Sequence, residues 1–236
     1  MNTKEIISQL KKLGTERNRE GMARFGIDSK SALGVSMPII RKFGKEIGTN
    51  PKLAINLWDT KVHEARILSC LINDPKTLTE KEMDKYANDF YSWDLCDQCC
   101  MNLFDKTPYA YKKAVEWSKD KKDFVKRAGF ALMASLAVHD KKASDSKLAK
   151  FFPYIINGST DERNFVKKAV NWALCQIGKR NMVLNKKAVA TAREILKLNS
   201  PAAKWIANDA IRELTDPVQL MRIRNKNSNS SSLRVF

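Results

Sequence analysis

No part of the 236-residue sequence contains the ~20 consecutive apolar residues that a membrane-spanning helix needs. The opening stretch, MNTKEIISQLKKLG, mixes acidic and basic side chains, which is typical of a short amphipathic helix and not of a secretory signal peptide. No segment alternates apolar and polar residues as a half-buried strand does. These absences argue against membrane, exported and β-sheet proteins, so we expect a soluble, cytoplasmic protein.

Acidic side chains are scarce relative to basic ones. The chain has 26 Asp and Glu against 43 Lys and Arg, which gives a formal net charge of +17. Hydrophobic residues still make up 43% of the sequence, enough to bury a sizeable core. A folded, strongly basic chain favours a polyanionic partner, because each neutralised phosphate releases condensed counterions. Nucleic acid and an anionic membrane surface are the two candidates.

Cysteine and histidine are also few, and their spacing supports no metal site. Five cysteines are an odd number, which argues against a disulfide framework and favours reduced thiols. Cys96 and Cys99 have C-x-x-C spacing, but no second pair follows to complete the four ligands of a zinc site. His63 and His139 lack ligand spacing too, and we expect them to be surface or hydrogen-bonded core residues. The sequence therefore predicts neither a metal nor a cofactor.

Helical periodicity extends along almost the whole chain. Apolar residues recur every three or four positions in segments such as EARILSCLI, FVKRAGFALMASLAV and FVKKAVNWALCQIG. Helix-breaking pairs separate these segments. The pairs are Asn50-Pro51, Asp74-Pro75, Thr107-Pro108, Asn157-Gly158, Ser200-Pro201 and Asp216-Pro217. Short helices joined by tight turns are expected.

Two of these segments are near copies of each other. FVKRAGFALMASLAV begins at Phe124 and FVKKAVNWALCQIG at Phe165, 41 residues later, and HEARILSCLI and AKWIANDAIREL are weaker copies. A period of about 35 to 45 residues is typical of HEAT or armadillo repeats. The prediction is an all-α fold, a HEAT-like helical repeat solenoid with a concave basic face. One domain is expected over residues 1–220, followed by a flexible, basic, Asn/Ser-rich tail over residues 221–236.

The repeat also predicts where some of the positive charge lies. Lys126-Arg127 and Lys167-Lys168 occupy the same position in the two close copies, so stacking would align them on one surface. Adjacent helical residues point about 100° apart, and we expect Arg127 and Lys168 to be the pair that faces phosphate. The alternative is a solvated polar face.

The stretch YSWDLCD places two carboxylates beside a tryptophan. If it is helical, Trp93 and Asp97 rise from one face about one turn apart. Asp94 lies three residues before Asp97, partly round the helix, and we expect it to cap the helix or to hold a neighbouring site residue in place. Trp172 lies in the last of the close copies. An indole, a carboxylate and basic residues thus recur at one level of successive repeats.

On the residues SWDLCD, FVKRAGFAL and FVKKAVNWAL, the sequence over roughly 1–220 resembles the DNA alkylation repair family, that of the AlkD-like HEAT-repeat DNA glycosylases. The resemblance implies that Asp97 is catalytic, that Trp93 and Trp172 cradle the damaged nucleotide, and that Arg127 supports the DNA backbone. It also implies a lesion that stays stacked in the duplex. In the family a second aromatic often precedes the tryptophan, whereas here Ser92 stands there.

Three functions remain open at this point. The first is a monofunctional glycosylase for cationic N3- or N7-alkylpurines in double-stranded DNA, acting as a monomer without an obligate protein partner. The second is a non-catalytic binder of duplex or branched DNA. The third, a helical scaffold for protein interactions, explains the repeats but not the +17 charge.

Overall fold

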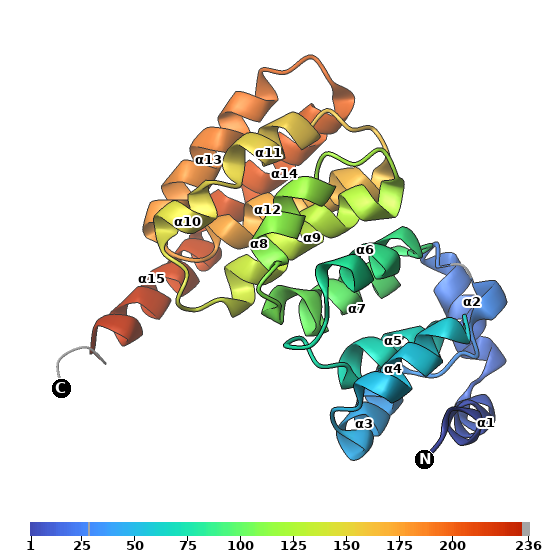
Figure 1. Ribbon diagram of the computed structural model, residues 1–236. Coiled ribbons are helices and arrows are strands. Elements are labelled where there is room, and N and C mark those ends of the chain that lie inside the picture. The colour runs from blue at the N-terminus through green and yellow to red at the C-terminus, as the bar shows by residue number, and fades with distance from the viewer. Residues whose placement is uncertain (28, 233–236) are drawn as a thin grey trace. The chain divides into compact units, whose positions relative to one another are not determined.

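The computed structural model describes residues 1–27 and 29–232, and every regular element in that part of the chain is a helix. The chain divides into two compact units, Met1–Tyr109 and a second that begins at Ala110. One domain over residues 1–220 is expected from the sequence. Figure 1 shows the helices of both units. The predicted all-α class is confirmed.

Over residues 1–27 and 29–109, the first unit contains seven α-helices and two 3-10 turns. They are α1 (Thr3–Leu13), α2 (Glu16–Arg24), η1 (Ser29–Ser31), α3 (Met37–Ile47), α4 (Pro51–Asp59), α5 (His63–Ile72), α6 (Glu80–Asn88), α7 (Trp93–Asn102) and η2 (Phe104–Lys106). Helix α5 is central, because it packs against α3, α4 and α7. Almost all of its side chains are buried, polar ones included.

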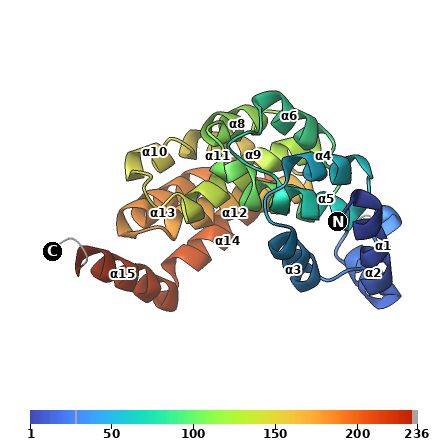
Figure 2. The same cartoon turned by 60° about the horizontal axis from the view of Figure 1, so that its bottom comes forward.

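The second unit contains the two close sequence copies as adjacent helices. Its elements are α8 (Ala110–Trp117), α9 (Asp123–His139), α10 (Asp145–Ala149), α11 (Phe152–Gly158), α12 (Asn164–Gly178), α13 (Met182–Leu196), α14 (Pro201–Thr215) and α15 (Pro217–Ser232). Helix α12 packs against both α9 and α14 (Figure 1 and Figure 2). The equivalent residues Phe124 and Phe165 touch, with ring centroids 5.6 Å apart. The two close copies of the predicted repeat therefore pack directly against each other as α9 and α12.

Local sequence signals account for the helix boundaries. Pro51, Pro201 and Pro217 each begin a helix, where the missing N–H of proline costs nothing. Capping boxes start two others: Asn2 with Glu5, and Thr79 with Glu82. The predicted boundaries at the proline pairs are confirmed.

The C-terminal segment differs from expectation. The sequence predicts a flexible tail over residues 221–236, but helix α15 continues from Pro217 to Ser232. Residues 233–236 lie outside the described part of the chain. Nothing in Asn-Ser-rich sequence forbids helix, since these residues lower helix propensity without blocking the backbone hydrogen bonds.

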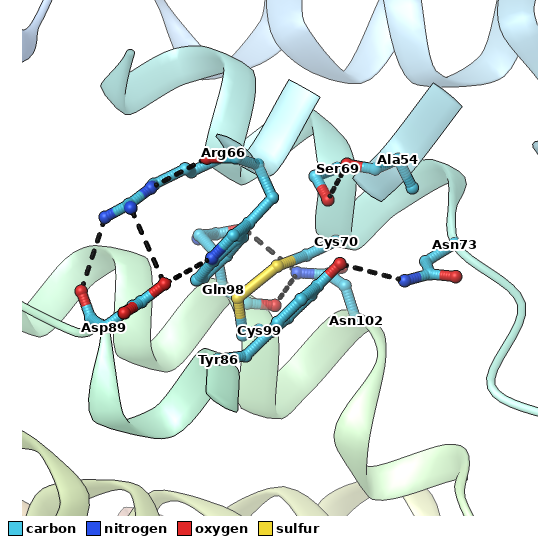
Figure 3. The surroundings of a disulfide bond; sticks show 11 residues. Ala54, Arg66, Ser69, Cys70, Asn73, Tyr86, Asp89, Gln98, Cys99 and Asn102 are labelled. Atoms are coloured by element: carbon cyan, nitrogen blue, oxygen red, sulfur yellow. Dashed lines mark hydrogen bonds and ion pairs between the residues drawn. A yellow bond between two sulfur atoms is a disulfide. The ribbon is translucent and has the colours of Figure 1, made fainter. Parts of the chain in front are cut away.

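A disulfide joins Cys70 of α5 to Cys99 of α7, which corrects the expectation of five reduced thiols. Packing of α5 against α7 brings the two Cα atoms to 5.3 Å, within the range that a disulfide spans. Figure 3 shows the bridge beside the ring of Tyr86 and near Arg66. The other three cysteines, Cys96, Cys100 and Cys175, are buried thiols.

Candidate functional site

Helix α7 carries the Trp93 and Asp97 pair that the sequence singled out. Trp93 is its first residue, Ser92 is its N-cap, and Asp97 follows one turn later, so the predicted helical spacing is confirmed. Both side chains are half-buried, and Trp93 Nε1 donates to the carbonyl oxygen of Phe25 at 3.0 Å. Helix α7 thus presents an indole and a carboxylate on one face, both partly accessible.

Asp94 is held by a buried network that begins in α5. Its Oδ2 lies 2.8 Å from Nε2 of His63, and its other oxygen accepts from the hydroxyl of Ser92. The second imidazole nitrogen of His63 lies 2.8 Å from the phenol of Tyr91, which in turn meets Ser31 at 3.2 Å. His63 is only 1% exposed, so it is a hydrogen-bonded core residue as expected.

Protonation states follow from this network. Burial raises the pKa of Asp94, but the hydrogen bonds that it accepts from His63 and from the hydroxyl of Ser92 outweigh that effect, so the pKa lies below its ordinary value. Burial raises the pKa of Tyr91, so its phenol stays protonated. The consistent arrangement has Tyr91 donating to Nδ1 of His63 and Nε2–H donating to Asp94. Asp94 is an ionised acceptor and not a proton donor.

The loop before α3 is tied to the same helix through Glu64. The carboxylate of Glu64 accepts from the backbone N–H groups of Leu33, Gly34 and Val35 at 2.7 to 3.1 Å. Gly34 has φ +80°, and a Cβ there would lie 2.2 Å from the carbonyl oxygen of Thr15, so only glycine fits. Helix α5 therefore fixes both the start of α7 and the loop that leads into α3.

A cavity of about 570 Å³ opens between α2, α3, α5 and α7. Trp93, Asp94 and Gln98 line it from α7, and His63, Glu64 and Ile67 line it from α5. This cavity was not predictable from the sequence, because its walls come from segments up to 81 residues apart, from Arg17 to Gln98. Among the residues that line the cavity, Trp93 alone was expected to contact a ligand, the damaged nucleotide.

Arg127, Lys168 and Trp172 lie in the second unit. Lys168 and Trp172 are one turn apart on α12, the lysine exposed and the indole half-buried. With the Gln176 amide oriented to satisfy its neighbours, its oxygen accepts from Nε1 of Trp172 at 3.2 Å. Helix α12 therefore brings a cation and an aromatic side chain together on one face.

Arg127 and Lys168 share a repeat position but differ in exposure. Arg127 is only 6% exposed, and its Nη1 donates to the carbonyl oxygen of Phe165 at 2.7 Å. Among the neighbouring basic residues, Lys126 pairs with Asp161 at 2.8 Å, and Lys167 lies 5.1 Å from the ring centroid of Trp205. Equal repeat positions therefore do not give equal accessibility to phosphate.

Neither a membrane span nor a metal cluster emerges from the described residues. No helix within residues 1–27 and 29–232 has the length and apolar character needed to cross a bilayer. Over the same ranges, no group of three or more His, Cys, Asp or Glu side chains is placed to hold a metal ion.

Comparison with known proteins identifies the fold and the family. A solved structure described as "a new family of proteins related to the HEAT-like repeat DNA glycosylases with affinity for branched DNA structures" superposes with a TM-score of 0.75 at 23% identity, over 90% of this chain and 95% of that one. The comparison with curated proteins gave no match. A family model described as "DNA alkylation repair enzyme" matches residues 6–214. The fold is therefore HEAT-like, and the chain belongs to the DNA alkylation repair enzyme family.

Proposed function

We propose that this protein is a DNA glycosylase that excises cationic N3- or N7-alkylated purines from duplex DNA. The observation that carries the proposal is the face of α7, where the carboxylate of Asp97 lies one turn from the indole of Trp93 and both are partly accessible. The family and the +17 charge support DNA as the substrate. Such a reaction needs no cofactor, and we expect a cytoplasmic monomer.

The proposed chemistry requires only one ionised carboxylate. An N3- or N7-alkylated purine already carries a positive charge, so it leaves the sugar without protonation by a general acid. The sugar then develops oxocarbenium character, which Asp97 stabilises while it orients the attacking water. Sugar hydrolases use a second carboxyl group because their leaving group is neutral. Asp94, bound to His63 and Ser92, is not available for that role.

The remaining site residues have proposed roles in binding. Trp93 and Trp172 attract the cationic base through their ring faces, an effect worth ~0.5–2 kcal/mol per contact. Lys168, exposed on α12, contacts the DNA backbone. Arg127 supports the backbone as well, and its hydrogen bond to Phe165 fixes the start of α12.

The decisive test is release of 7-methylguanine from a methylated duplex, measured by chromatography. Wild-type protein releases the base and leaves the strand intact, because no lysine is assigned as a Schiff-base nucleophile. Asp97→Asn lowers the rate by about 100-fold or more, because it removes the charge that stabilises the sugar. Its affinity for duplex DNA stays the same or rises slightly, since a negative charge is lost.

Asp59→Asn is the matched control, because it removes an exposed carboxylate of α4 that pairs with Lys85. That variant keeps full release. Near wild-type release by Asp97→Asn would remove Asp97 from the mechanism. No release by wild-type protein, with binding intact, would favour the second candidate, a non-catalytic binder. The structural relative described by its affinity for branched DNA is the observation behind that alternative, so a four-way junction belongs among the binding substrates.

A further inference from the structure

The most exposed tryptophan of the chain, Trp205, has no role in the proposed excision. It lies on α14 and is 41% exposed, whereas the other four tryptophans are half-buried or buried. A tryptophan side chain combines a large flat ring with little conformational freedom, so it binds flat partners at a low entropic cost. The exposed ring of Trp205 is therefore a candidate binding surface.

Contacts at successive turns join α14 to α12 in register. Nζ of Lys167 lies 5.1 Å from the ring centroid of Trp205, and the side-chain amide of Asn171 donates to Asp209 at 2.7 Å. In both contacts the α14 residue follows the α12 residue by 38 positions, so the two helices run in the same direction. The N-terminal half of α14, with Trp205, therefore lies beside the N-terminal half of α12.

Three lysines accompany this ring. The ammonium group of Lys167 lies within cation–π distance of it, and Lys168 and Lys204 are the chain neighbours of the two contacting residues. Lys168 and Lys204 are both exposed, and among the described residues 1–27 and 29–232 neither forms an ion pair. An aromatic ring bordered by lysines suits a polyanion that carries flat groups, which is the chemistry of a nucleic acid strand.

The carboxylates beside this surface are already engaged. Glu162 accepts from the hydroxyl of Ser200 at 2.8 Å and from the backbone N–H of Ala202 at 3.1 Å. Asp209 forms an ion pair with Arg212 on its own helix. The charge of the three lysines therefore remains available to phosphate groups.

We propose that Trp205 is a stacking platform for an unpaired base of DNA, with Lys167, Lys168 and Lys204 on the phosphates of the same strand. An indole can hold any base, because every base has a π face, but in an intact duplex neighbouring base pairs cover those faces. The platform therefore distinguishes DNA with single-stranded nucleotides, such as a flap, from fully paired duplex. The inference rests on DNA as the partner and goes beyond base excision, since it needs neither Asp97 nor a damaged base.

The first test compares two forms of one duplex, which carry single-stranded flaps of equal length. One flap consists of thymidines, and the other has the same phosphates and sugars but no bases. The readout is the dissociation constant from fluorescence anisotropy at one salt concentration. Wild-type protein binds the thymidine flap about fivefold or more tightly than the abasic flap, because stacking on Trp205 needs a base whereas attraction to the lysines does not.

Variants at exposed positions test the location without a large effect on folding. Trp205→Leu keeps an apolar side chain but removes the ring, so it binds the two flaps equally, whereas Trp205→Phe keeps most of the preference. The control is Val183→Ala, which trims another exposed apolar side chain, 55% exposed on α13, and keeps the full preference. Lys204→Ala lowers the slope of log K against log salt concentration by about 0.7 for either flap, the contribution of one single-strand phosphate.

Two results would overturn the proposal: equal affinities of the two flaps for the wild-type protein, or an unchanged preference in Trp205→Leu. Release of 7-methylguanine from a fully paired methylated duplex separates this proposal from the glycosylase. If wild-type protein releases the base but does not prefer the thymidine flap, the glycosylase stands and the platform fails. If the preference is present and depends on Trp205 but no base is released, the platform stands and the glycosylase fails.

Discussion

Lys126 and Lys168 illustrate how a side-chain partner decides what a basic residue contributes to DNA binding. Lys126 already forms an ion pair with Asp161 at 2.8 Å, and Asp161 also accepts from Arg163. Lys168 is exposed on α12, on the same face as Trp172. The positive charge of Lys126 is already balanced by the carboxylate of Asp161, whereas that of Lys168 can replace a counterion on phosphate. The two residues should therefore differ in their effect on the salt dependence of DNA binding.

We expect Lys168→Ala to reduce the slope of log K against log salt concentration by about one unit, equally for damaged and undamaged duplex. Lys126→Ala should change the slope much less and should lower the free energy of unfolding, since Asp161 loses a charged hydrogen bond worth ~1.5–3 kcal/mol. A salt titration of binding, with chemical denaturation of both variants, gives the two readouts. An unchanged slope for Lys168→Ala would identify this basic face as merely solvated.

Contacts within one helix were predictable from the sequence, whereas contacts between distant residues were not. The one-turn spacing of Trp93 and Asp97 was predictable because helical periodicity is local. The contact between His63 and Asp94 was not, since it joins residues 31 positions apart whose types are common in ordinary cores. Arg127 and Lys168 were both expected to face phosphate because they share a repeat position. Its burial depends on the carbonyl of Phe165 in the next helix, which no pattern within α9 encodes.

Helix boundaries were predictable for the same local reason, whereas helix pairing was predictable only through the repeat. A proline fixes its own φ and lacks an N–H group, so it is favoured at the first turn of a helix and ends a preceding one. The contact between α9 and α12 followed from their shared sequence. The disulfide between α5 and α7 did not, because both cysteines sit in helices whose mutual packing the sequence leaves open.

Close packing of α8 against α9 leads to a prediction on two glycines. At Gly129 of α9, a Cβ would lie 2.3 Å from the backbone nitrogen of Ser118, at the end of α8. Backbone cannot move aside as a flexible side chain does, so Gly129→Ala should lower the free energy of unfolding by about 1–3 kcal/mol or more.

Gly21→Ala should act in the opposite direction. Gly21 lies inside α2, where an added Cβ meets open space, so the gain in helix propensity of about 0.5–1 kcal/mol is not offset by a clash. Thermal or chemical denaturation of the two variants measures both effects. Equal stability changes for Gly129→Ala and Gly21→Ala would contradict the packing of α8 on α9.

The composition of the chain indicated the kind of partner, a polyanion, but not the residues that form the candidate site. A net charge of +17 indicated a polyanion, and membership of a DNA alkylation repair family agrees with DNA as that polyanion. Composition carries no information on the cavity beside Trp93, which needs four helices in their folded positions. The partition into two compact units at Tyr109 was likewise not visible in the sequence.

The state of the five cysteines can be tested on the intact protein. Cys96, Cys100 and Cys175 are buried, and burial raises the pKa of Cys100 and of Cys175 well above the ordinary thiol value. Cys70 and Cys99 have no thiol. We expect no adduct by intact mass after treatment of the native protein with iodoacetamide, and three adducts after unfolding without reductant. An adduct on a native cysteine would contradict this burial.

Thiolates are the most nucleophilic groups that proteins offer to methylating agents, and the folded chain exposes none. The electrophiles that would create its proposed substrate in DNA therefore find no cysteine to attack in the protein. We therefore expect the cysteines of the folded protein to stay unmodified when such agents are present. Burial of the cysteines thus limits their reaction with these electrophiles, in addition to filling the core.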